Sequence, residues 1–301
     1  MVRVRVPATT ANLGAGFDVL GLSLALYNEV DATASDTLVI TMEGEGAAEL
    51  PRDASNLVWK AAQQVFAHVG RAAPGARLHM RNAIPLESGL GSSAAAVVAG
   101  MLLGNALIGG QVDREMLLAL AIDMEGHPDN VAPAMLGGLI AAGRDDTGRP
   151  MVTRLSTPAL KAVVVMPDAR LSTAVARRAL PKTFPMADAV FNLGHLALTI
   201  AAFQQGDYDL LARAMDDRLH QPYRAPLVPG LAEALAAARA CGAAAAISGA
   251  GPAVVAFAAD GHAALAACIV ECFAKAGCAA RSWVLDVAEG ACVEPLGSSL
   301  D

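Results

Sequence analysis

The stretch from Ser88 to Val112 carries no charged side chain. A run of this length must be buried, either in the core of a globular protein or in a lipid bilayer. It opens on glycine and serine residues and contains Asn105, and these features favour a core helix over a membrane span. We therefore predict a buried helix from about Ser93 to Ile108, and we expect no association with a membrane.

The segment that leads into this helix reads "PLESGLGSSAAA" (residues 85–96). A helix N-terminus offers unpaired N–H groups and a partial positive charge, so it attracts phosphate. Gly89 and Gly91 would let the backbone approach an anion closely, and Ser92 and Ser93 add hydroxyls for a phosphate oxygen or for Mg²⁺. Glycine and serine before a helix are also common in ordinary loops and caps. Both interpretations stay open on this segment alone.

Two other nucleotide-binding motifs can be tested against the chain. The Walker A pattern is absent, since no Gly-Lys pair occurs. Residues 89–94 do satisfy G-x-G-x-x-A, a variant of the Rossmann fingerprint. That fingerprint requires a strand running directly into the first glycine, whereas Pro85 to Ser88 intervene here. A Rossmann oxidoreductase is therefore only a remote alternative.

Composition narrows the class of protein. The chain has 301 residues, enough for one large domain or two, and a core built mainly from Ala, Val and Leu, because 54% of it is hydrophobic but only 4% aromatic. The net charge is −7 without a dense Lys/Arg run, so we expect no nucleic-acid partner. The N-terminus has no apolar segment of signal-peptide length, and we expect a cytoplasmic protein.

The five cysteines are an odd number and form no C-x-x-C motif. Cys268 and Cys272 lie one helical turn apart, a spacing that a metal site could use. We favour reduced, buried thiols of a cytosolic enzyme instead.

Hydrophobic periodicity predicts alternating strands and helices. Strict alternation indicates a strand over Val2–Val6, ended by Pro7. Further strands are predicted at the end of "ANLGAGFDVLGLSLALYNEV", where a glycine-punctuated loop returns into a strand, at "TLVITM", "ARLHM" and "KAVVVMP", on either side of "SGAGP", and at Arg281–Asp286. Further helices are predicted from Ser55 or Asn56, over Arg114–Glu125, in "STAVARRALP" up to Pro181, near Asp188–Gln204, Tyr208–Arg218 and Leu231–Cys241, and over His262–Lys275. The mixture predicts an α+β protein with two lobes joined near residues 143–160.

Four polar, glycine-rich stretches interrupt the otherwise apolar sequence: "ATTANLGAGFDVLG", the segment 85–96, "EGHPDNVAP" and "ISGAGPAVV". We expect these loops to meet in one cleft, which would make a candidate active site.

These stretches together resemble the GHMP small-molecule kinases, and among them the homoserine kinases. "PLESGLGSSAAA" resembles the phosphate loop P-x-x-x-G-L-G-S-S-A-A of that superfamily. "VPATTANLGAGFDVLGLSL", "EGHPDNVAPAMLGG", "STAVARRALP" and "ISGAGPAVVAF" resemble further family motifs, in register from about residue 2 to about 286. Ala253 departs from the pattern, because many relatives carry Thr or Ser there. That departure puts one polar contact in doubt.

The resemblance implies a two-lobed GHMP kinase fold. Its N-terminal domain, residues 1–150, would be a ribosomal-protein-S5-like lobe with a left-handed βαβ crossover. Its C-terminal domain, residues 151–301, would be a ferredoxin-like lobe. ATP would lie between the lobes with its phosphates along the loop and its adenine in the syn conformation.

The resemblance also assigns the nucleotide and metal sites. The residues that it implies for ATP are Asn56, Pro85, Leu86, Glu87, Ser88, Gly89, Leu90, Gly91, Ser92, Ser93, Gly249 and Gly251, with Pro252 beside them. Ser93 and Glu125 are the implied protein ligands of Mg²⁺, an ion that takes few carboxylates. The plain alternatives are a solvent-exposed carboxylate for Glu125, a helix N-cap for Asn56, and a tight strand connection for the glycines of "SGAGP".

Homoserine, the substrate that the resemblance implies, is a zwitterion with a hydroxyl tail, so its pocket needs a carboxylate clamp and an ammonium acceptor, and arginine suits the carboxylate. The substrate residues implied by the resemblance are Asn12, Asp18, His127, Asn130, Thr173, Arg177 and Arg224, with Arg178 as a less favoured alternative to Arg177. The catalytic set is Asn130, Glu125 and Ser93. Asn130 would orient the substrate hydroxyl while the phosphate assists proton loss, and Asp129 would support the loop.

The implied reaction is Mg·ATP-dependent phosphorylation of the L-homoserine hydroxyl to O-phospho-L-homoserine, on the way to threonine, by a homodimer. One alternative is a GHMP kinase for another small alcohol, such as a mevalonate-pathway intermediate. The Asp18, Arg177 and Arg224 set argues against such a substrate, which lacks an α-ammonium group. The other alternative is a GHMP-fold binding protein without catalysis, and intact Ser93 and Glu125 argue against it.

Overall fold

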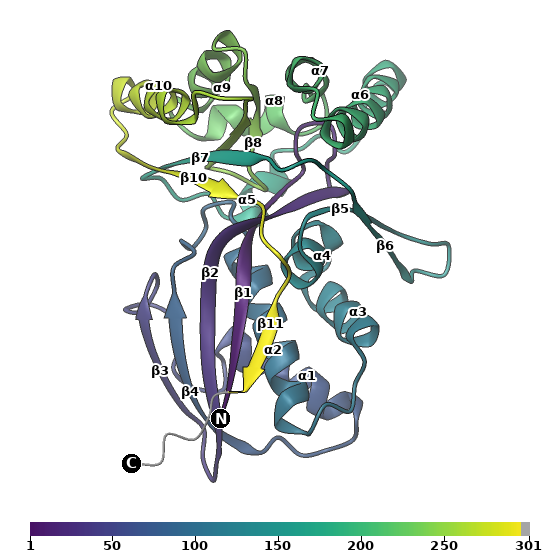
Figure 1. Cartoon of the computed structure of the whole chain (residues 1–301), viewed down its shortest axis with the longest axis vertical. Coiled ribbons are helices and arrows are strands. Elements are labelled where there is room, and N and C mark those ends of the chain that lie inside the picture. Colours follow the sequence, from purple (N-terminus) through teal and green to yellow (C-terminus); the bar gives the residue numbers. More distant parts are fainter. Residues whose placement is uncertain (296–301) are drawn as a thin grey trace.

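The computed structural model describes residues 1–295 and has two lobes, each built around one β-sheet (Figure 1). The first lobe contains a seven-stranded sheet with the order β11-β1-β2-β4-β3, extended by β5 and β6 from β2. Its strands are β1 (Val2–Ala11), β2 (Leu20–Ser35), β3 (Val39–Gly44), β4 (Gly75–Asn82), β5 (Leu139–Arg144), β6 (Pro150–Leu155) and β11 (Cys292–Pro295). Only β3 and β4 pair in parallel, and the helix α1 (Leu57–His68) connects them.

The prediction that Pro7 ends the first strand is wrong. β1 continues to Ala11, and its register against β2 shifts between Pro7 and Ala8. A strand tolerates proline at such an irregularity, because a ladder hydrogen bond is already missing there. The longer strand carries Thr9 and Thr10 to the phosphate loop.

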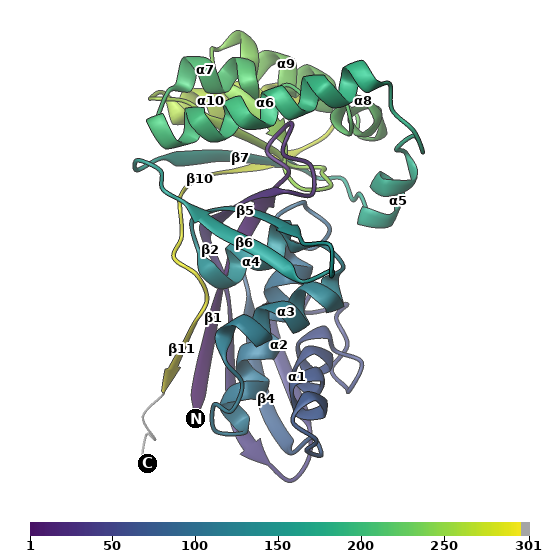
Figure 2. The same ribbon diagram turned by 90° about the vertical axis from the view of Figure 1, so that its right-hand side faces the viewer.

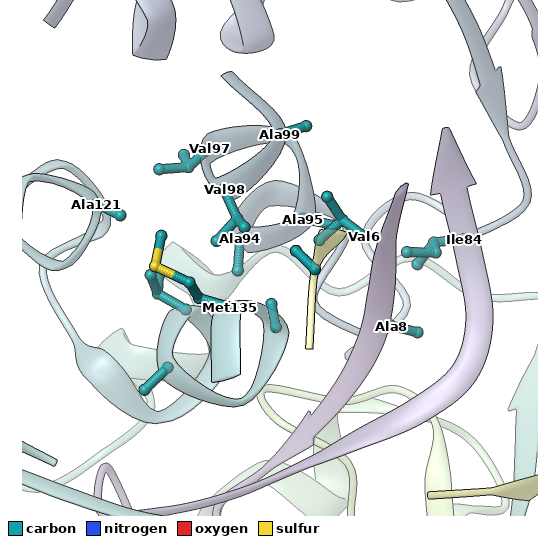
Figure 3. Close-up of a cluster of buried hydrophobic side chains, with 14 of the residues drawn as sticks. Val6, Ala8, Ile84, Ala94, Ala95, Val97, Val98, Ala99, Ala121 and Met135 are labelled. Atoms are coloured by element: carbon teal, nitrogen blue, oxygen red, sulfur yellow. The ribbon is translucent and has the colours of Figure 1, made fainter. Parts of the chain in front are cut away.

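A helical layer covers one face of this sheet (Figure 1). It contains α1, α2 (Ser92–Leu107), α3 (Arg114–Glu125) and α4 (Pro128–Leu136). The uncharged α2 lies at its centre, and alanine and valine side chains of this helix pack towards β1 and its neighbouring helices (Figure 3). A Cβ atom on Gly100 would lie 2.1 Å from the carbonyl oxygen of Val58, so α1 and α2 cross in close contact there. The predicted buried helix is confirmed, one residue earlier than expected.

The segment "EGHPDNVAP" is not the loop that was expected. Its second half forms α4, which begins at Pro128 and contains Pro133. Proline is favoured in the first turn of a helix, where its missing N–H costs no hydrogen bond. His127 and Asp129 therefore lie at a helix N-terminus instead of in a free loop.

The second lobe contains a four-stranded sheet with the order β10-β7-β9-β8. Its strands are β7 (Lys161–Pro167), β8 (Ala244–Ile247), β9 (Val254–Phe257) and β10 (Ala280–Asp286). Its helices are α5 (Thr173–Arg178), α6 (Met186–Gln205), α7 (Tyr208–Ala214), α8 (Gln221–Arg224), the 3₁₀ helix η1 (Ala225–Leu227), α9 (Leu231–Ala240) and α10 (His262–Lys275). One face of the sheet packs against α9 and α10, and the other joins a core shared with α6, α7 and the first lobe.

The chain crosses between the lobes twice. After β6 it enters the second lobe, and after β10 it returns so that β11 pairs with β1, near the N-terminus (Figure 1). The predicted boundary near residue 150 stays a prediction. The return of β11 adds a C-terminal strand to the first sheet, and residues 296–301 of the predicted second domain lie outside the described residues.

Among the described residues, α6 is the one helix long and apolar enough to cross a membrane by length and composition, and 22% of its most apolar window is buried in the protein. Asn192 on α6 donates a hydrogen bond to Asp217, and Thr199 donates one to the carbonyl of Ala214. These contacts attach one side of α6 to the second lobe. Figure 2 shows the helix along the outside of that lobe.

The prediction of buried thiols is wrong. Cys241 is exposed, and the other four cysteines are half-buried. Cys241 and Cys268 lie at a helix end and on an outer helix face, and their Sγ atoms are 3.6 Å apart.

Candidate active site

One cleft brings together residues from all four predicted loops. It is lined by the β1–β2 loop, the phosphate loop before α2, the α3–α4 junction, α5 and the β8–β9 turn. The predicted residues that line it are Asn12, Asp18, Glu87, Ser88, Gly89, Gly91, Ser92, Ser93, Glu125, His127, Asn130, Thr173, Arg177, Arg224, Gly249 and Gly251, together with Asp129. Arg178, the alternative to Arg177, is not among the lining residues. Residues up to about 240 positions apart thus share one solvent-accessible space.

The phosphate loop depends on two glycines. Gly89 and Gly91 have φ values of +81° and +69°, in the left-handed region that favours glycine. A Cβ atom on Gly89 would lie 2.1 Å from the carbonyl oxygen of Ser248, and one on Gly91 would lie 2.0 Å from Thr9 Oγ1. Gly91 is also the N-cap of α2 and supplies no side-chain cap, so the first N–H groups of the helix are available to an anion.

Strand β1 and the β8–β9 connection hold this loop by hydrogen bonds. Thr9 N–H donates to the carbonyl of Leu90, and Ala253 N–H donates to that of Ser88. The Ser248 hydroxyl is 2.7 Å from the carbonyl of Gly89. Since the bond from Ala253 comes from its backbone, it does not require the side chain by which this position departs from the family pattern.

Ser93 and Glu125 meet across the cleft. Ser93 Oγ donates to Glu125 Oε2 over 2.9 Å, and the two residues come from the first turn of α2 and the last residue of α3. Oxygen ligands of this kind suit Mg²⁺. Within residues 1–295 no group of three or more His, Cys, Asp or Glu side chains is arranged to hold a metal ion. An ion at this pair would therefore take its remaining ligands from water and from the bound nucleotide.

Asn130 and His127 lie at the start of α4. Thr9 Oγ1 donates to Asn130 Oδ1 over 2.8 Å, which orients the amide and leaves its NH₂ group as a donor. His127 Nδ1 lies 2.9 Å from Asp129 Oδ1. The hydrogen bond to Asp129 raises the pKa of His127 despite its partial burial, which favours the positively charged form of the ring.

Asp18 and Arg177 form a bidentate ion pair, with distances of 2.9 and 2.8 Å between the guanidinium nitrogens and the carboxylate oxygens. The hydrogen bonds from this guanidinium to Asp18 raise the pKa of Arg177. Asn12 Oδ1 accepts from the backbone N–H of Asp18, and Asn12 Nδ2 donates to the carbonyl of Gly249. The groups expected to bind a substrate ammonium and a substrate carboxylate therefore neutralise each other here.

Arg224, unlike Arg177, is buried and forms no ion pair among the described residues. It is 1% exposed, its Nη1 donates to the carbonyl of Gly249 and contacts His220 Nδ1, and its Nε has no hydrogen-bond partner in the described part of the chain. Burial lowers the pKa of Arg224 to about 10, with Arg177 as a second cause. A buried guanidinium without an adjacent carboxylate is costly, because an isolated buried charge loses its hydration. The side chain nevertheless lines the cleft.

A second cavity of about 410 Å³ adjoins the first. The two share Glu87, Ser92 and Ser93, and the second is lined mainly by apolar side chains such as Leu50, Pro51, Leu57, Val58, Met80 and Leu86. Asn56 lines it and also caps α1, since its side chain accepts from Val58 N–H and donates to the carbonyl of Pro51. Both interpretations of Asn56 are therefore compatible with the structure.

Pro85 and Leu90 line neither cavity. The carbonyl of Pro85 accepts from the Ser88 hydroxyl, and the Leu90 side chain is buried in the core. Pro85 and Leu90 therefore support the conformation of the phosphate loop and do not face either cavity.

Sequence reasoning missed four residues that hold the site in place. Thr9 donates to Asn130, and the hydroxyl oxygens of Thr10 and Ser248 lie 2.9 Å apart in a second hydrogen bond. Phe17 stacks on His220 with ring centroids 5.1 Å apart. Thr9, Thr10 and Phe17 lie inside the stretch "ATTANLGAGFDVLG", which was expected at the cleft without roles for these three residues, and the one local signal for His220 was its spacing of four residues from Arg224.

Comparison with known proteins extends these observations. The family model of the GHMP kinases N terminal domain matches residues 56–138, and that of the GHMP kinases C terminal domain matches residues 199–280. A homoserine kinase of Moorella thermoacetica is 50% identical over 262 residues, covering 85% of this chain and 87% of that protein. A homoserine kinase of Desulfitobacterium hafniense is 42% identical over 97% of this chain and 100% of its own. The crystal structure of homoserine kinase from Cytophaga hutchinsonii superimposes with a TM-score of 0.88 at 31% identity, covering 97% of each chain.

Proposed function

The chain belongs to the homoserine kinase family of the GHMP kinases, and from this premise we propose that its cleft transfers the γ-phosphoryl group of ATP to the side-chain hydroxyl of L-homoserine. The products are O-phospho-L-homoserine and ADP, in a step of threonine biosynthesis. The observation that carries this proposal is the charge pattern of the cleft. Two arginines and one aspartate lie beside a glycine-rich phosphate loop.

The charge pattern suits an α-amino acid. Within residues 1–295 the buried Arg224 forms no ion pair, although Asp18, Asp217 and Asp129 lie near enough to act on its pKa, and a substrate carboxylate would supply a direct ionic partner. We assign the substrate ammonium to Asp18 and a second carboxylate contact to Arg177. Bound substrate would then separate the Asp18–Arg177 ion pair. Asp18 would pair with the substrate ammonium instead of Arg177, and Arg177 would pair with the substrate carboxylate instead of Asp18.

Phosphoryl transfer depends on positioning and on neutralising charge. The phosphates would lie against Gly89, Gly91 and the first N–H groups of α2. Ser93 and Glu125 would hold Mg²⁺, which when bound neutralises the phosphate charge. The NH₂ group of Asn130, oriented by Thr9, would donate to the substrate hydroxyl, and the proton of that hydroxyl would pass to the transferred phosphate. His127, whose pKa is raised by its hydrogen bond to Asp129, would add positive charge nearby in its protonated form.

The second cavity suits the nucleoside of ATP. Its mostly apolar lining can bury an aromatic base, and it meets the cleft at Ser92 and Ser93, beside the phosphate loop. The peptide and side-chain oxygens around Asn56 provide polar contacts for the base. We place the adenosine there and the homoserine in the first cleft.

We also propose that the enzyme is a cytoplasmic homodimer whose interface includes α6. Its outward side carries an apolar stripe, with Met186, Leu193 and Val190 exposed by 77%, 67% and 58%. The members of this α6 stripe are Met186, Val190, Leu193, Gly194, Ala197 and Ala201.

The α6 stripe is complementary to itself. Two copies of α6 related by a two-fold axis between Leu193 and Gly194 would run antiparallel. Each Val190 would then face Ala197 of the other copy, and each Leu193 would face Gly194. A large side chain would thus meet a small one at each level, and the two helix dipoles would oppose each other favourably.

The substrate is tested by measuring ADP release over a panel of small alcohols in the presence of Mg²⁺ and ATP. We expect L-homoserine to give the highest kcat/KM. Turnover of mevalonate without turnover of homoserine would establish the alternative GHMP kinase. No turnover of any alcohol, with ATP binding intact, would establish the binding protein.

A further inference from the structure

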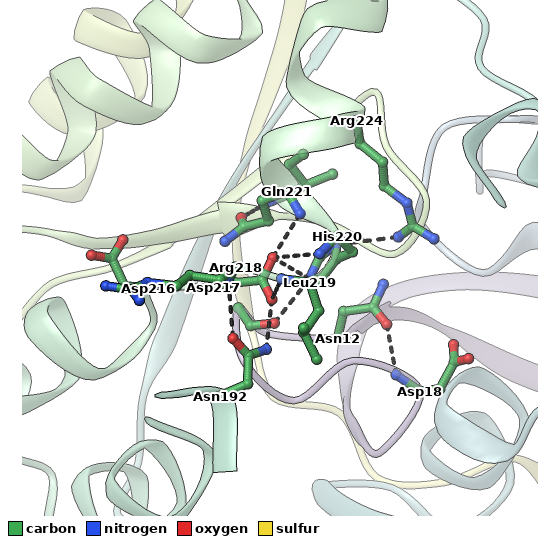
Figure 4. A network of polar contacts seen from close by, with 12 residues as sticks. Asn12, Asp18, Asn192, Asp216, Asp217, Arg218, Leu219, His220, Gln221 and Arg224 are labelled. Carbon is green, nitrogen blue, oxygen red and sulfur yellow. Dashed lines mark hydrogen bonds and ion pairs between the residues drawn. The ribbon is translucent and has the colours of Figure 1, made fainter. Parts of the chain in front are cut away.

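His220 lies behind the proposed substrate site and does not line the cleft. Its ring is fully buried, and each of its two nitrogens lies at hydrogen-bond distance from one partner (Figure 4). Nδ1 lies 3.3 Å from Nη1 of Arg224, and Nε2 lies 2.9 Å from the carbonyl oxygen of Gly14. The ring therefore connects the helix that carries Arg224 to the loop that carries Asn12 and Asp18.

The two partners determine the tautomer of this ring. A guanidinium can only donate, so Nδ1 must accept, and a carbonyl oxygen can only accept, so Nε2 must carry the proton. A protonated ring would direct a second donor and a second positive charge at Arg224. Burial first, and the charge of Arg224 as well, lower the pKa of His220, whereas Asp217, with Oδ2 3.6 Å from Nε2, and the more distant Asp18 act in the opposite direction. The ring is thus neutral, with its Nδ1 lone pair towards Arg224.

The surroundings hold this ring in one orientation. Asp217 accepts from the backbone N–H groups of His220 and Gln221 over 2.9 and 2.6 Å, which fixes the start of α8. Asn192 donates to the same carboxylate over 2.7 Å (Figure 4). Phe17 stacks on the ring at an interplanar angle of 21° and also lies 5.1 Å from the guanidinium carbon of Arg224.

We propose that His220 is a positioning residue that aims the guanidinium of Arg224 at the carboxylate of the substrate. This inference rests on the proposed function. Without the Nδ1 acceptor, the Arg224 guanidinium keeps one described hydrogen bond, to the carbonyl of Gly249, and can turn about it. His220 therefore acts on recognition of the carboxylate and leaves the phosphoryl-transfer step unchanged.

Two substitutions separate the two contacts of the ring. The side-chain amide of asparagine reaches the place of Nδ1, so His220→Asn keeps an acceptor for Arg224 and loses the contact with Gly14. The longer glutamine reaches the place of Nε2, so His220→Gln keeps a donor for Gly14 and loses the acceptor. His220→Gln removes the hydrogen bond from the charged guanidinium of Arg224. Because hydrogen bonds of charged groups are the stronger ones, we expect the KM for homoserine to rise about tenfold or more in this variant. His220→Asn should stay within about threefold of wild type, and the ATP KM and kcat should change little in either variant.

A substrate without the carboxylate gives a second measurement. For 3-aminopropan-1-ol, which has the hydroxyl and amine of homoserine but no carboxylate, His220→Gln and wild type should have the same kcat/KM. Equal KM values for homoserine in wild type and His220→Gln would overturn the inference while leaving the proposed function intact. If wild type itself does not phosphorylate homoserine, it is the proposed function that fails.

The tautomer can be measured on the wild-type protein, so the inference does not depend on the folding of a variant. The ¹⁵N chemical shifts of the His220 ring should show an unprotonated Nδ1 and a protonated Nε2 from about pH 6 to about pH 9. A protonated Nδ1 would rule out the acceptor role.

Discussion

Replacing Gly91 by alanine tests whether the phosphate loop requires a glycine for close contact as well as for its backbone conformation. At φ +69° an alanine is strained by about 1–2 kcal/mol. Its Cβ would also lie 2.0 Å from Thr9 Oγ1 and 3.2 Å from Asn130 Oδ1. Thr9 is fully buried and cannot move aside freely, and overpacking of this kind costs about 1–3 kcal/mol more.

Gly109→Ala is the matched control. Gly109 also has a left-handed φ, +85°, but a Cβ there would meet no atom within 4 Å. The control therefore carries the strain alone, about 1–2 kcal/mol, against about 2–5 kcal/mol for Gly91→Ala. At about 2–4 °C of Tm per kcal/mol for a chain of this size, the two should differ by several degrees in a thermal unfolding scan.

Activity provides the second measurement. The Cβ of Gly91→Ala would displace the Thr9 hydroxyl and so break its hydrogen bond to Asn130, which orients the proposed donor to the substrate hydroxyl. We expect kcat to fall at least about tenfold in Gly91→Ala and to stay within about twofold of wild type in Gly109→Ala. Equal Tm values for the two variants, together with an unchanged kcat, would refute the close contact as the reason for this glycine.

Three further predictions follow from the site and the surface. Glu125→Ala should lower kcat at least about a hundredfold and raise the Mg²⁺ concentration needed for half-maximal rate, whereas Glu115→Ala, at the exposed start of the same helix, should leave a magnesium titration unchanged. The hydrogen bond to Asp129 raises the pKa of His127 above its usual value of 6.5, so the stability that ionised His127 contributes is fully present below pH 6.5 and is lost as the pH rises through the folded-state pKa. The Tm difference between wild type and His127→Gln should therefore shrink from about pH 5.5 to about pH 8.5. A Tm difference that grew with pH would contradict a raised pKa for this ring. Leu193→Asp should convert a dimer to a monomer in sedimentation, whereas Val284→Asp, at an exposed valine on β10, should not; a dimer that survives Leu193→Asp would exclude the α6 stripe as the interface.

Local sequence signals predicted much of the fold. The helices over 114–125 and 262–275 begin and end where the hydrophobic periodicity indicated. The strands β5, β6 and β11 were not predicted, because each is short and its place depends on a partner strand far along the chain. The same reason explains Pro7, since only the pairing with β2 shows the irregularity that accommodates a proline.

The candidate site was also predictable from the sequence only in part. The four polar stretches and the residue types in them indicated a phosphate-binding cleft, because a glycine-rich turn before an uncharged helix has a local physical meaning. The roles of individual residues remain proposals. Sequence reasoning also placed Asp18 and Arg177 as separate binding groups, whereas the structure pairs them across 159 positions of the chain.

By itself the sequence determined the buried helix α2, the glycines that open it and the extent of α3, because helix periodicity and left-handed backbone conformation act over a few residues. Only the tertiary structure decided which charges are neutralised and which are not. The contact from His220 to Gly14, 206 positions away, and the buried Arg224 without a carboxylate partner depend on distances that no local pattern encodes. Electrostatic energy in a protein interior is set by burial and by the nearest opposite charge, and both are properties of the folded chain.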